Sequence, residues 1–371
     1  MSLFVLMAGG TGGHLFPAMA LAQELRRRGH TIHLMTDHRV TSYGADFPAR
    51  EVHVVPSATP SISNPVKFVA ACFKILWGTG VAWGKLGQVR PDAVIGFGGY
   101  PVFPPFLAAS LSGIPGILHE QNAVMGRANR ALARFARVVA LSFAETRYAD
   151  ATKTEKVVTG NPVRDAVRAV SGTPYPGLKE TDAIHLLVFG GSQGARVMAD
   201  LVPPAIAALP EGMRTRIAIT QQCRAEDMDR VRAAYDGLGV RADLQPFFAD
   251  MPARIAATHL VVSRSGASTV AELAVIGRPA IMIPLPGALD QDQKANAEVM
   301  ARAGGGWMVE QRDMSPARLA SDLADLLDHP DSLAAAAEAA LRVGRPDAAE
   351  KLADVAEAVA QRKPFKEAAA A

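Results

Sequence analysis

Two glycine-rich turns are the segments of this sequence best suited to bind a phosphate. Residues 9–14 (GGTGGH) follow a short apolar run, and residues 190–195 (GGSQGA) follow another about half a chain later. Each turn precedes a helical pattern, and the free N–H groups at a helix N-terminus attract anions. Two such α/β units predict two domains that face each other with a phosphorylated ligand between them, which is typical of an enzyme.

A third glycine turn, residues 263–272 (SRSGASTVAE), has two interpretations. Its backbone amides can hold a pyrophosphate, and Glu272 can accept two hydrogen bonds from the diol of a ribose. Thr269 and Glu272 also match a capping box, which satisfies the N–H groups of a helix without any ligand. A fourth turn, residues 96–101 (GFGGYP), offers a further approach for a phosphate in the first half of the chain.

His14 is the candidate general base. It falls in the first turn of the first helix, where the positive end of the helix dipole lowers the pKa of an imidazole and favours its neutral form. A lone histidine is more often structural, but this one stands beside a glycine turn at a strand end. Residues 119–122 (HEQN) follow another strand, and we expect their polar groups at the same edge of the sheet.

Several other ligand classes fit the sequence poorly. The first turn lacks the third glycine of a dinucleotide fingerprint, because Leu15 stands there, and no Walker A lysine follows either turn. Asp37 is more consistent with a strand-end cap than with a ribose-binding acid. Residues 290–292 (DQD) resemble a metal-binding Asp-x-Asp pattern, but residues 227–229 (DMD) match equally well. With Gln293, the turn at 290–293 fits sugar hydroxyls better, and we expect no metal.

Composition indicates a globular protein of two domains. The 371 residues are 49% apolar and 20% charged. Residues 1–160 hold 16 Lys and Arg against 9 Asp and Glu, whereas residues 161–371 hold 23 against 27, so the first part should face an anionic partner. No nucleic-acid motif accompanies this charge. Cys72 and Cys223 lack metal spacing, and we expect a reducing compartment, no signal peptide and no membrane span.

Residues 64–85 combine an apolar stripe with lysines. The apolar residues at helical spacing are Phe68, Val69, Cys72, Phe73, Leu76 and Trp77, joined by Val81 and Trp83. The lysines are Lys67, Lys74 and Lys85. Such a stripe usually belongs to a core, but tryptophans beside lysines also fit a contact with a membrane surface. A second basic feature, formed by Arg127, Arg130, Arg134 and Arg137, has the spacing of one helix face.

Alternation of strand and helix patterns predicts the fold class. It indicates parallel sheets with helices on both faces, arranged as two Rossmann-like domains. We place the first domain at residues 1–162 and the second at 163–345, because a Gly-Asn-Pro breaker at 160–162 interrupts the alternation. Ligands of such sheets bind at the carboxyl ends of the strands, so the residues after each strand are the candidates.

Taken together, these motifs resemble the MurG family of peptidoglycan glycosyltransferases. The matching segments are GGTGGH at 9–14, GFGGY at 96–100, HEQN at 119–122, GNPVR at 160–164, GGSQGA at 190–195 and RSGA at 264–267. They span the chain in family order, which makes the resemblance highly specific. It implies the glycosyltransferase B architecture, with a C-terminal helix at 346–366 packing back on the first domain.

The resemblance also implies an activity. It implies transfer of N-acetylglucosamine from UDP-GlcNAc to undecaprenyl-diphospho-N-acetylmuramoyl-pentapeptide (lipid I), forming lipid II, at the cytoplasmic face of the inner membrane. The acceptor's C4 hydroxyl would attack the anomeric carbon with inversion, and His14 or an unidentified carboxylate would take its proton. Proteins of wall synthesis and cell division are expected partners.

Site roles follow residue by residue. Ser192 would contact phosphate, Glu272 the ribose diol, and Arg164 and the backbone at Phe248 the uracil. The full implied donor set is Thr11, Gly12, Gly13, Asn122, Arg164, Ser192, Phe248, Ala267, Ser268, Thr269, Glu272 and Gln293. The acceptor diphosphate would lie on Gly12, Gly13, Gly98, Gly99 and Tyr100. The membrane contact would be Phe68, Phe73, Leu76, Trp77 and Trp83 with Lys67, Lys74 and Lys85.

The sequence departs from the family pattern at two positions. Three other functions also stay open as alternatives. Phe248 replaces an aliphatic residue, and Asp292 stands where a histidine often precedes the glutamine, which weakens the role of Gln293. The other functions are a UDP-GlcNAc 2-epimerase on the same fold, a regulatory module that binds a nucleotide sugar, and an NAD-dependent oxidoreductase. The missing dinucleotide fingerprint argues against the last.

Overall fold

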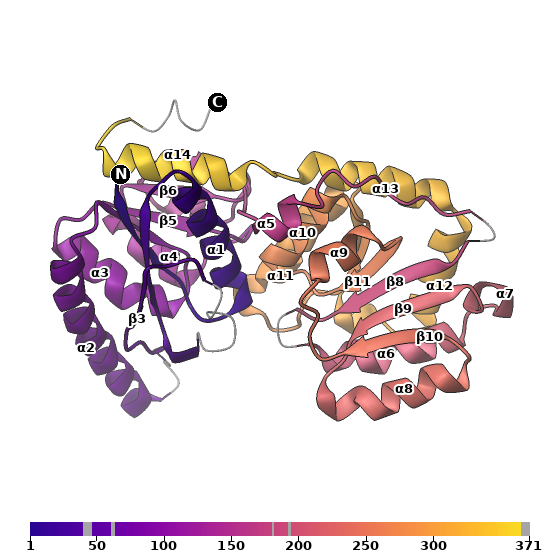
Figure 1. Cartoon of the computed structure of the whole chain (residues 1–371). Helices are drawn as coiled ribbons and strands as arrows, with labels where there is room; N and C mark the ends of the chain where they lie inside the picture. The colour runs from indigo at the N-terminus through magenta and orange to yellow at the C-terminus, as the bar shows by residue number, and fades with distance from the viewer. Residues whose placement is uncertain (40–46, 61–63, 180–181, 192–193, 365–371) are drawn as a thin grey trace. The chain divides into compact units, whose positions relative to one another are not determined.

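The chain forms two α/β units, as the alternating pattern predicts. A computed structural model describes residues 1–39, 47–60, 64–179, 182–191 and 194–364 (Figure 1). One compact unit comprises Met1–Asp165 with Pro346–Ala371, and the other comprises Ala166–Arg345. The division between them lies three residues after the boundary expected at residue 162, so Arg164 and Asp165 belong to the first unit.

The first unit is built on a seven-stranded sheet in which every neighbouring pair is parallel. In spatial order the strands are β3 (Glu51–Val54), β2 (Thr31–Thr36), β1 (Leu3–Met7), β4 (Ala93–Gly96), β5 (Gly116–Glu120), β6 (Val138–Leu141) and β7 (Lys156–Val158). Its helices are α1 (Gly12–Arg27), α2 (Pro65–Val89), α3 (Phe103–Leu111), α4 (Arg127–Leu132) and α14 (Ala348–Ala360), and α5 (Asp165–Arg168) crosses into the second unit.

Strand β1 lies in the middle of the sheet and is buried on both faces. Phe4 and Leu6 belong to a core cluster that includes residues of α1 and α14. Val5 and Met7 belong to a second cluster on the opposite face, with residues of α2 and α3. Successive side chains of a strand point to opposite faces, so this uninterrupted apolar strand serves two cores at once.

The C-terminal helix α14 packs back on the first unit, as the resemblance implies (Figure 1). Arg28, which follows α1, donates to Asp354 at 2.6 Å and to Glu357 at 2.9 Å. His30 also contacts Glu357, at 2.7 Å. These pairs and the shared apolar core tie the end of the chain to its beginning.

The second unit has a six-stranded parallel sheet. In spatial order its strands are β10 (Arg241–Gln245), β9 (Ile217–Gln222), β8 (Ile184–Phe189), β11 (Leu260–Ser263), β12 (Ala280–Met282) and β13 (Gly306–Met308). Its helices are α6 (Arg196–Ala207), α7 (Glu211–Arg214), α8 (Met228–Gly237), α9 (Met251–Ala256), α10 (Ala267–Ile276), α11 (Asp292–Arg302), α12 (Pro316–Asp328) and α13 (Pro330–Val343).

One helical expectation is confirmed and one is wrong. Helix α1 begins at Gly12, so His14 lies in its first turn, as expected. The four arginines do not share one helix face. Helix α4 ends at Leu132, Arg134 lies in the 3₁₀ turn Ala133–Phe135, and Arg137 follows that turn.

Helix α2 buries small residues and exposes large ones. Its buried residues are Ala71, Gly78, Ala82 and Leu86. The side chains of Phe73, Leu76, Trp77 and Trp83 are between 62% and 71% exposed, and Phe68 is 40% exposed. The reading of this stripe as core is therefore wrong, since the large side chains point away from the domain.

The length of α2 also bears on the expectation of no membrane span. Among the described helices, α2 is the one long and apolar enough to cross a membrane, with a mean hydropathy of 1.3 over its best window. One such helix is weak evidence for a span. Its small-residue face packs on the first unit, where Ala82 and Leu86 join the core.

Gly78 and Gly84 in α2 should respond oppositely to alanine. A Cβ at Gly78 would lie 2.0 Å from the Pro56 carbonyl oxygen, whereas a Cβ at Gly84 has nothing within 4 Å. We expect Gly78→Ala to destabilise the chain by about 1–3 kcal/mol through overpacking. Gly84→Ala should stabilise it by up to about 1 kcal/mol through helix propensity. Urea unfolding followed by circular dichroism measures both, and equal effects would contradict this packing.

Candidate active site

The strand order of the first unit reverses at β1, which has β2 on one side and β4 on the other. At such a point the loops after the two central strands lead to opposite faces of the sheet, and ligands of open α/β sheets bind beside them. The glycine turns at 9–13 and 97–99 are the loops after β1 and β4. The sequence motifs therefore lie where this architecture places a ligand.

The turn after β1 is preorganised for an anion. Thr11 is the N-cap of α1, its side chain makes no hydrogen bond to the helix, and the first turn holds no acidic residue. Gly13 is exposed, and a Cβ there would meet nothing within 4 Å. The helix dipole and N–H groups therefore remain available to a negatively charged ligand.

Asp37 is a structural carboxylate behind this turn. It accepts hydrogen bonds from the Gly10 N–H at 3.3 Å and from the Arg39 N–H at 3.1 Å, and it pairs with the Arg39 guanidinium at 2.6 Å. Burial acts to raise the pKa of Asp37, but the hydrogen bonds and charge of Arg39 outweigh it and lower the pKa. The Asp37 carboxylate is bound to Gly10 and Arg39 at the strand end, which agrees with the cap interpretation.

The turn after β4 lies directly against His14. Gly98 and Gly99 both have φ of +77°, a region that favours glycine. A Cβ at Gly99 would come within 3.2 Å of His14 Nε2, and one at Gly98 within 3.2 Å of the Asn129 side-chain nitrogen. Tyr100 then begins a 3₁₀ helix that ends at Val102. Only residues without a side chain allow this turn to approach the imidazole so closely.

The HEQN segment is more deeply buried than expected. His119, Glu120 and Gln121 are at most 2% exposed, and only Asn122 is partly accessible. Glu120 holds the segment together, because one of its carboxylate oxygens accepts from the Asn122 N–H at 3.0 Å and from its side-chain amide at 3.1 Å. The other oxygen accepts from the Gly126 N–H at 2.9 Å and from the Asn129 amide at 2.8 Å. Asn122 is thus held at the surface by a buried carboxylate.

The tautomer of His119 determines how the Gln121 amide is oriented. Its Nε2 lies 3.0 Å from the Gly160 carbonyl, which can only accept, so Nε2 carries the proton. Burial lowers the pKa of His119 to about 4, against the opposite effect of the Gly160 hydrogen bond. The ring is therefore neutral near pH 7, and its Nδ1 is an acceptor. Gln121, 3.1 Å from this Nδ1, must present its NH₂ group there.

The orientation of Gln121 in turn determines the tautomer of His14. Its nitrogen also donates to the His119 carbonyl at 3.1 Å, so its oxygen faces His14, whose Nδ1 lies 3.4 Å away. An amide oxygen can only accept, and the proton of neutral His14 is therefore on Nδ1. The lone pair remains on Nε2, the atom beside Gly99. These contacts select the tautomer of His14 that can accept a proton at the β4 turn.

Arg164 lies in the first unit, not with the donor domain to which the sequence assigned it. Its guanidinium stacks on the Phe16 ring of α1, with the carbon 4.0 Å from the ring centroid. The next residue, Asp165, pairs with Arg27 of the same helix at 2.8 Å. These contacts move the unit boundary beyond Arg164.

The glycine turn of the second unit follows β8. A Cβ at Gly190 would lie 2.3 Å from the Ala195 nitrogen, so only glycine fits at position 190. Gly191 and Gly194 have φ of +87° and +66°. Ser192, the expected phosphate contact, lies outside the described residues.

Helix α10 begins earlier than the capping-box interpretation requires. Its N-cap is Gly266, which places Thr269 third in the helix rather than at the cap. That interpretation is therefore wrong, and Glu272 is a buried carboxylate on the second turn, 8% exposed. Ala267, Ser268 and Thr269 form the first turn, and the Ser268 hydroxyl finds no hydrogen-bond partner among the described residues. This turn has the open N–H groups of a phosphate site.

Arg264 and Gln293 support the neighbouring loop. The buried Arg264 guanidinium donates to the carbonyls of Ile283 and Pro284 at 2.9 Å each, and burial lowers its pKa. The Gln293 side-chain oxygen accepts from the Leu285 N–H at 3.0 Å, and its backbone carbonyl accepts from Ser265 at 2.8 Å. Gln293 therefore joins the start of α11 to the turn before α10.

The side chain of Phe248 is buried, so it is closed to a ligand. Its ring is 2% exposed and is covered by the Arg254 guanidinium at 4.2 Å. The segment follows β10, at the same carboxyl edge of the sheet as the turns after β8 and β11. The substitution of an aliphatic residue by phenylalanine is thus absorbed inside the unit.

Sequence reasoning expected Glu120 and Gln121 at this edge of the sheet but gave them no role, and it missed Asn129. The HEQN motif was a signal for the first two, but it could not reveal which polar groups face inward. Asn129 had no signal, because its nearness to Gly98 arises only when α4 packs beside the β4 turn.

Comparisons with known proteins agree with this arrangement. The model of the glycosyltransferase family 28 N-terminal domain matches residues 4–141, and that of the C-terminal domain matches residues 185–357. The solved structure of MurG from Acinetobacter baumannii superposes with a TM-score of 0.77 at 31% identity, covering 96% of this chain and 99% of that one. A UDP-GlcNAc 2-epimerase from Neisseria meningitidis, at 12% identity and a TM-score of 0.67, shares the fold.

Two curated relatives are similar over nearly their full length. The first, from Mesorhizobium japonicum, is 52% identical over 361 residues, covering 97% of this chain and 96% of the relative. The second, from Methylobacterium sp. (strain 4-46), is 55% identical over 353 residues, covering 95% of each. Both are named UDP-N-acetylglucosamine–N-acetylmuramyl-(pentapeptide) pyrophosphoryl-undecaprenol N-acetylglucosamine transferase. The chain therefore belongs to glycosyltransferase family 28 and, within it, to the MurG family.

Proposed function

We propose that this chain is an inverting transferase that moves N-acetylglucosamine from UDP-GlcNAc to undecaprenyl-diphospho-MurNAc-pentapeptide. The observation that carries the proposal is full-length similarity, at 52% and 55% identity, to curated transferases with this activity in their names. The product is a peptidoglycan precursor, so we infer that the chain serves cell-wall assembly. Proteins that maintain cell shape and carry out division are expected partners.

The second unit is suited to the UDP leaving group. Negative charge builds on the diphosphate as the glycosidic bond breaks, and preorganised N–H groups stabilise it. The first turn of α10 has such groups, and we expect the turn at 190–195 to add more, with Ser192, Ser268 and Thr269 as side-chain donors. Glu272 would bind the ribose diol, and the backbone at Phe248 the uracil. Ala267 and Gln293 would border the sugar.

The first unit is suited to the acceptor. Its diphosphate would rest on the turns after β1 and β4, through Gly12, Gly13, Gly98, Gly99 and Tyr100. Thr11 and Asn122 would contact the sugar that is transferred, and Arg164 would extend toward the nucleotide.

His14 is the proposed general base for the acceptor's C4 hydroxyl. The hydroxyl oxygen forms the new bond to the anomeric carbon, its proton passes to His14 Nε2, and the electron pair of the broken bond leaves with UDP. The contacts of Gln121 support this role, because they keep the proton on Nδ1 and the lone pair on Nε2. Gln121 is then a positioning residue.

UDP release tests the function directly. We expect UDP to form from UDP-GlcNAc only when a prenyl-diphosphate-linked muramoyl-pentapeptide is present, with a β-linked disaccharide as the second product. A 2-epimerase would act on UDP-GlcNAc without lipid, and a regulatory module would bind it without releasing UDP. Either result would contradict the proposal.

Variants at positions 14 and 121 test the base. His14→Ala should lower kcat by roughly 10²- to 10⁴-fold, the usual contribution of a general base. Gln121→Leu removes the side-chain hydrogen bonds to His14 and His119 and should lower kcat while the KM for UDP-GlcNAc stays near wild type. Gln121→Glu places a carboxylate at His14, which raises the pKa of the imidazole. The acid limb of the pH–rate profile should therefore move to higher pH.

Two measurements separate this role from a structural one. Thermal unfolding shows whether each Gln121 variant is folded at the assay temperature, and UDP-GlcNAc binding shows whether the donor site is intact. A folded Gln121→Glu enzyme with an unchanged pH profile would mean that Gln121 does not act on the base. Full turnover by His14→Ala would remove the base assignment itself.

The exposed face of α2 is the proposed membrane contact. Phe68, Phe73, Leu76, Trp77 and Trp83 project from it, and clusters of exposed large apolar residues mark interaction surfaces. Lys67, Lys74 and Lys85 are exposed and spaced by seven and eleven residues, so they follow one edge of this face. Aromatic rings would enter the headgroup region while the lysines meet anionic lipid. We therefore place the chain at the cytoplasmic face of the inner membrane as a peripheral protein.

Vesicle sedimentation tests the membrane contact. The double variant Phe73→Ser with Trp77→Ser should lose at least tenfold in partitioning onto phosphatidylglycerol vesicles, since each buried aromatic contributes roughly 1.5–3 kcal/mol. Lys74→Glu should reduce the preference for anionic over zwitterionic vesicles. Leu111→Ser, at an exposed position of α3, is the matched control. Wild-type partitioning by the double variant would rule out this face.

A further inference from the structure

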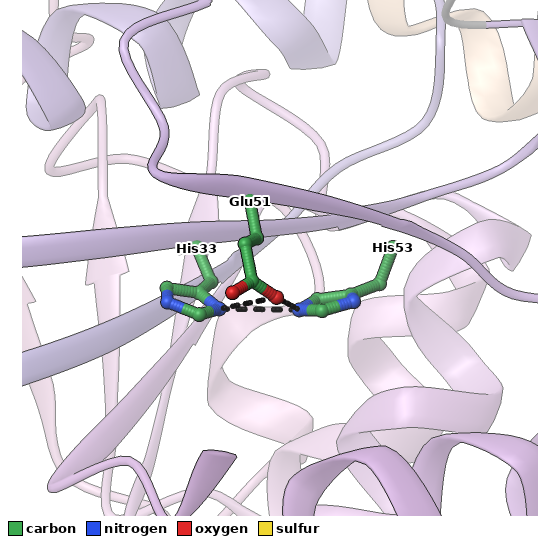
Figure 2. Close-up of side chains that lie close together, drawn as sticks. All are labelled: His33, Glu51 and His53. Carbon is green, nitrogen blue, oxygen red and sulfur yellow. Dashed lines mark hydrogen bonds and ion pairs between the residues drawn. The ribbon is translucent and has the colours of Figure 1, made fainter. Parts of the chain in front are cut away.

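Three potential metal ligands converge on the first unit, apart from the glycine turns. His33 lies on β2, and Glu51 and His53 lie on β3 (Figure 2). Among the described residues they are the one group of three or more His, Cys, Asp or Glu whose ligand atoms all approach within 4.8 Å of one another. In Figure 2 the two imidazoles and the carboxylate point toward a common centre.

The strand register brings these residues together. Strands β2 and β3 are parallel neighbours, with His33 opposite Glu51 and Met35 opposite His53. Residues two apart on a strand share a face, so all three side chains project from the same side of the sheet. His33 is buried, His53 is partly buried and Glu51 is exposed. The group therefore opens to solvent on one side.

The distances fit a metal ion. His33 Nδ1 and His53 Nε2 are 3.1 Å apart, and the Glu51 Oε2 atom lies 4.0 Å from the first and 3.7 Å from the second. In the plane of these three atoms, the point equidistant from them lies about 2.1 Å from each, which matches zinc–nitrogen and zinc–oxygen bonds of about 2.0–2.2 Å.

A hydrogen bond between the two imidazoles explains only part of this arrangement. It accounts for the 3.1 Å contact, but it leaves the Glu51 oxygen too far from either ring to be hydrogen-bonded. A cation at the centre accounts for all three distances, because each group presents a lone pair to it.

We propose that His33, Glu51 and His53 form a binding site for Zn²⁺. Two imidazole nitrogens and one carboxylate oxygen are a ligand set that zinc accepts, with water in the remaining position. The ion would join the edge strand β3 to β2 and so stabilise the margin of the sheet. The proposal rests on the geometry of the first unit and does not depend on glycosyl transfer.

Charged groups around the three residues both favour and oppose a bound cation. Burial lowers the pKa of His33 and of His53, and the charge of Glu51 acts against it. Arg50 acts on His33 and Lys85 on His53, and both positive charges also oppose a cation. Glu51 supplies the one negative charge of the ligand set.

Zinc binding to the full chain tests the proposal. Chelator-treated, tag-free protein is titrated with Zn²⁺ by calorimetry, and the melting temperature is followed with and without the metal. We expect one saturable site per chain and a rise in Tm, because a ligand that binds only the folded state stabilises it. Co²⁺ in place of Zn²⁺ should give the visible absorption of a low-coordinate site.

Conservative variants locate the ion. His53→Gln and Glu51→Gln should each weaken Zn²⁺ binding at least tenfold and abolish the rise in Tm, since even indirect supports of a metal site contribute 10- to 100-fold. His329→Gln, which changes an exposed histidine near a single carboxylate, is the matched control. The absence of a saturable site, or wild-type affinity in both ligand variants, would overturn the proposal. Unchanged UDP-GlcNAc binding confirms that the variants are folded.

Discussion

The close approach of the β4 turn to His14 is the constraint on which the candidate site depends. Gly98 and Gly99 adopt a backbone conformation that other residues rarely tolerate, and a Cβ at Gly99 would lie only 3.2 Å from His14 Nε2. The N-terminus of α1, the imidazole of His14 and the β4 turn are thereby held within one small region. An anion at α1 and a hydroxyl at His14 Nε2 would be neighbours for this reason.

Beneath that region, a buried polar chain gives the imidazole a defined role. The Gly160 carbonyl determines the tautomer of His119, His119 orients Gln121, and Gln121 orients His14. Each step follows from the fact that a carbonyl only accepts and that a buried neutral ring has one donor and one acceptor. Glu120 organises the other side of the same segment with four hydrogen bonds. Buried hydrogen-bond networks of this kind restrict the arrangements that a site can adopt.

Helix α2 packs on the domain through its small residues and exposes its large apolar residues to solvent. Its small residues approach the domain closely enough that Gly78 touches the Pro56 carbonyl region, while its aromatic residues are left outside. A helix that packs through glycine and alanine has its large apolar side chains free for another contact. The same helix carries Lys85, whose charge reaches His53 on the edge strand.

The sequence by itself determined the two parallel-sheet units, the glycine turns at their strand ends, and the membership of a glycosyltransferase family, because these depend on local periodicity and on motifs that occur in order. It also located His14, Gly98 and Gly99. Only the tertiary structure decided which residues share a surface. Asn129 reaches the β4 turn, Arg164 stacks on Phe16, and His33 meets His53 because strands and helices distant in sequence pack side by side. Whether the stripe of α2 points inward also depended on packing, since periodicity identifies a face but not what covers it.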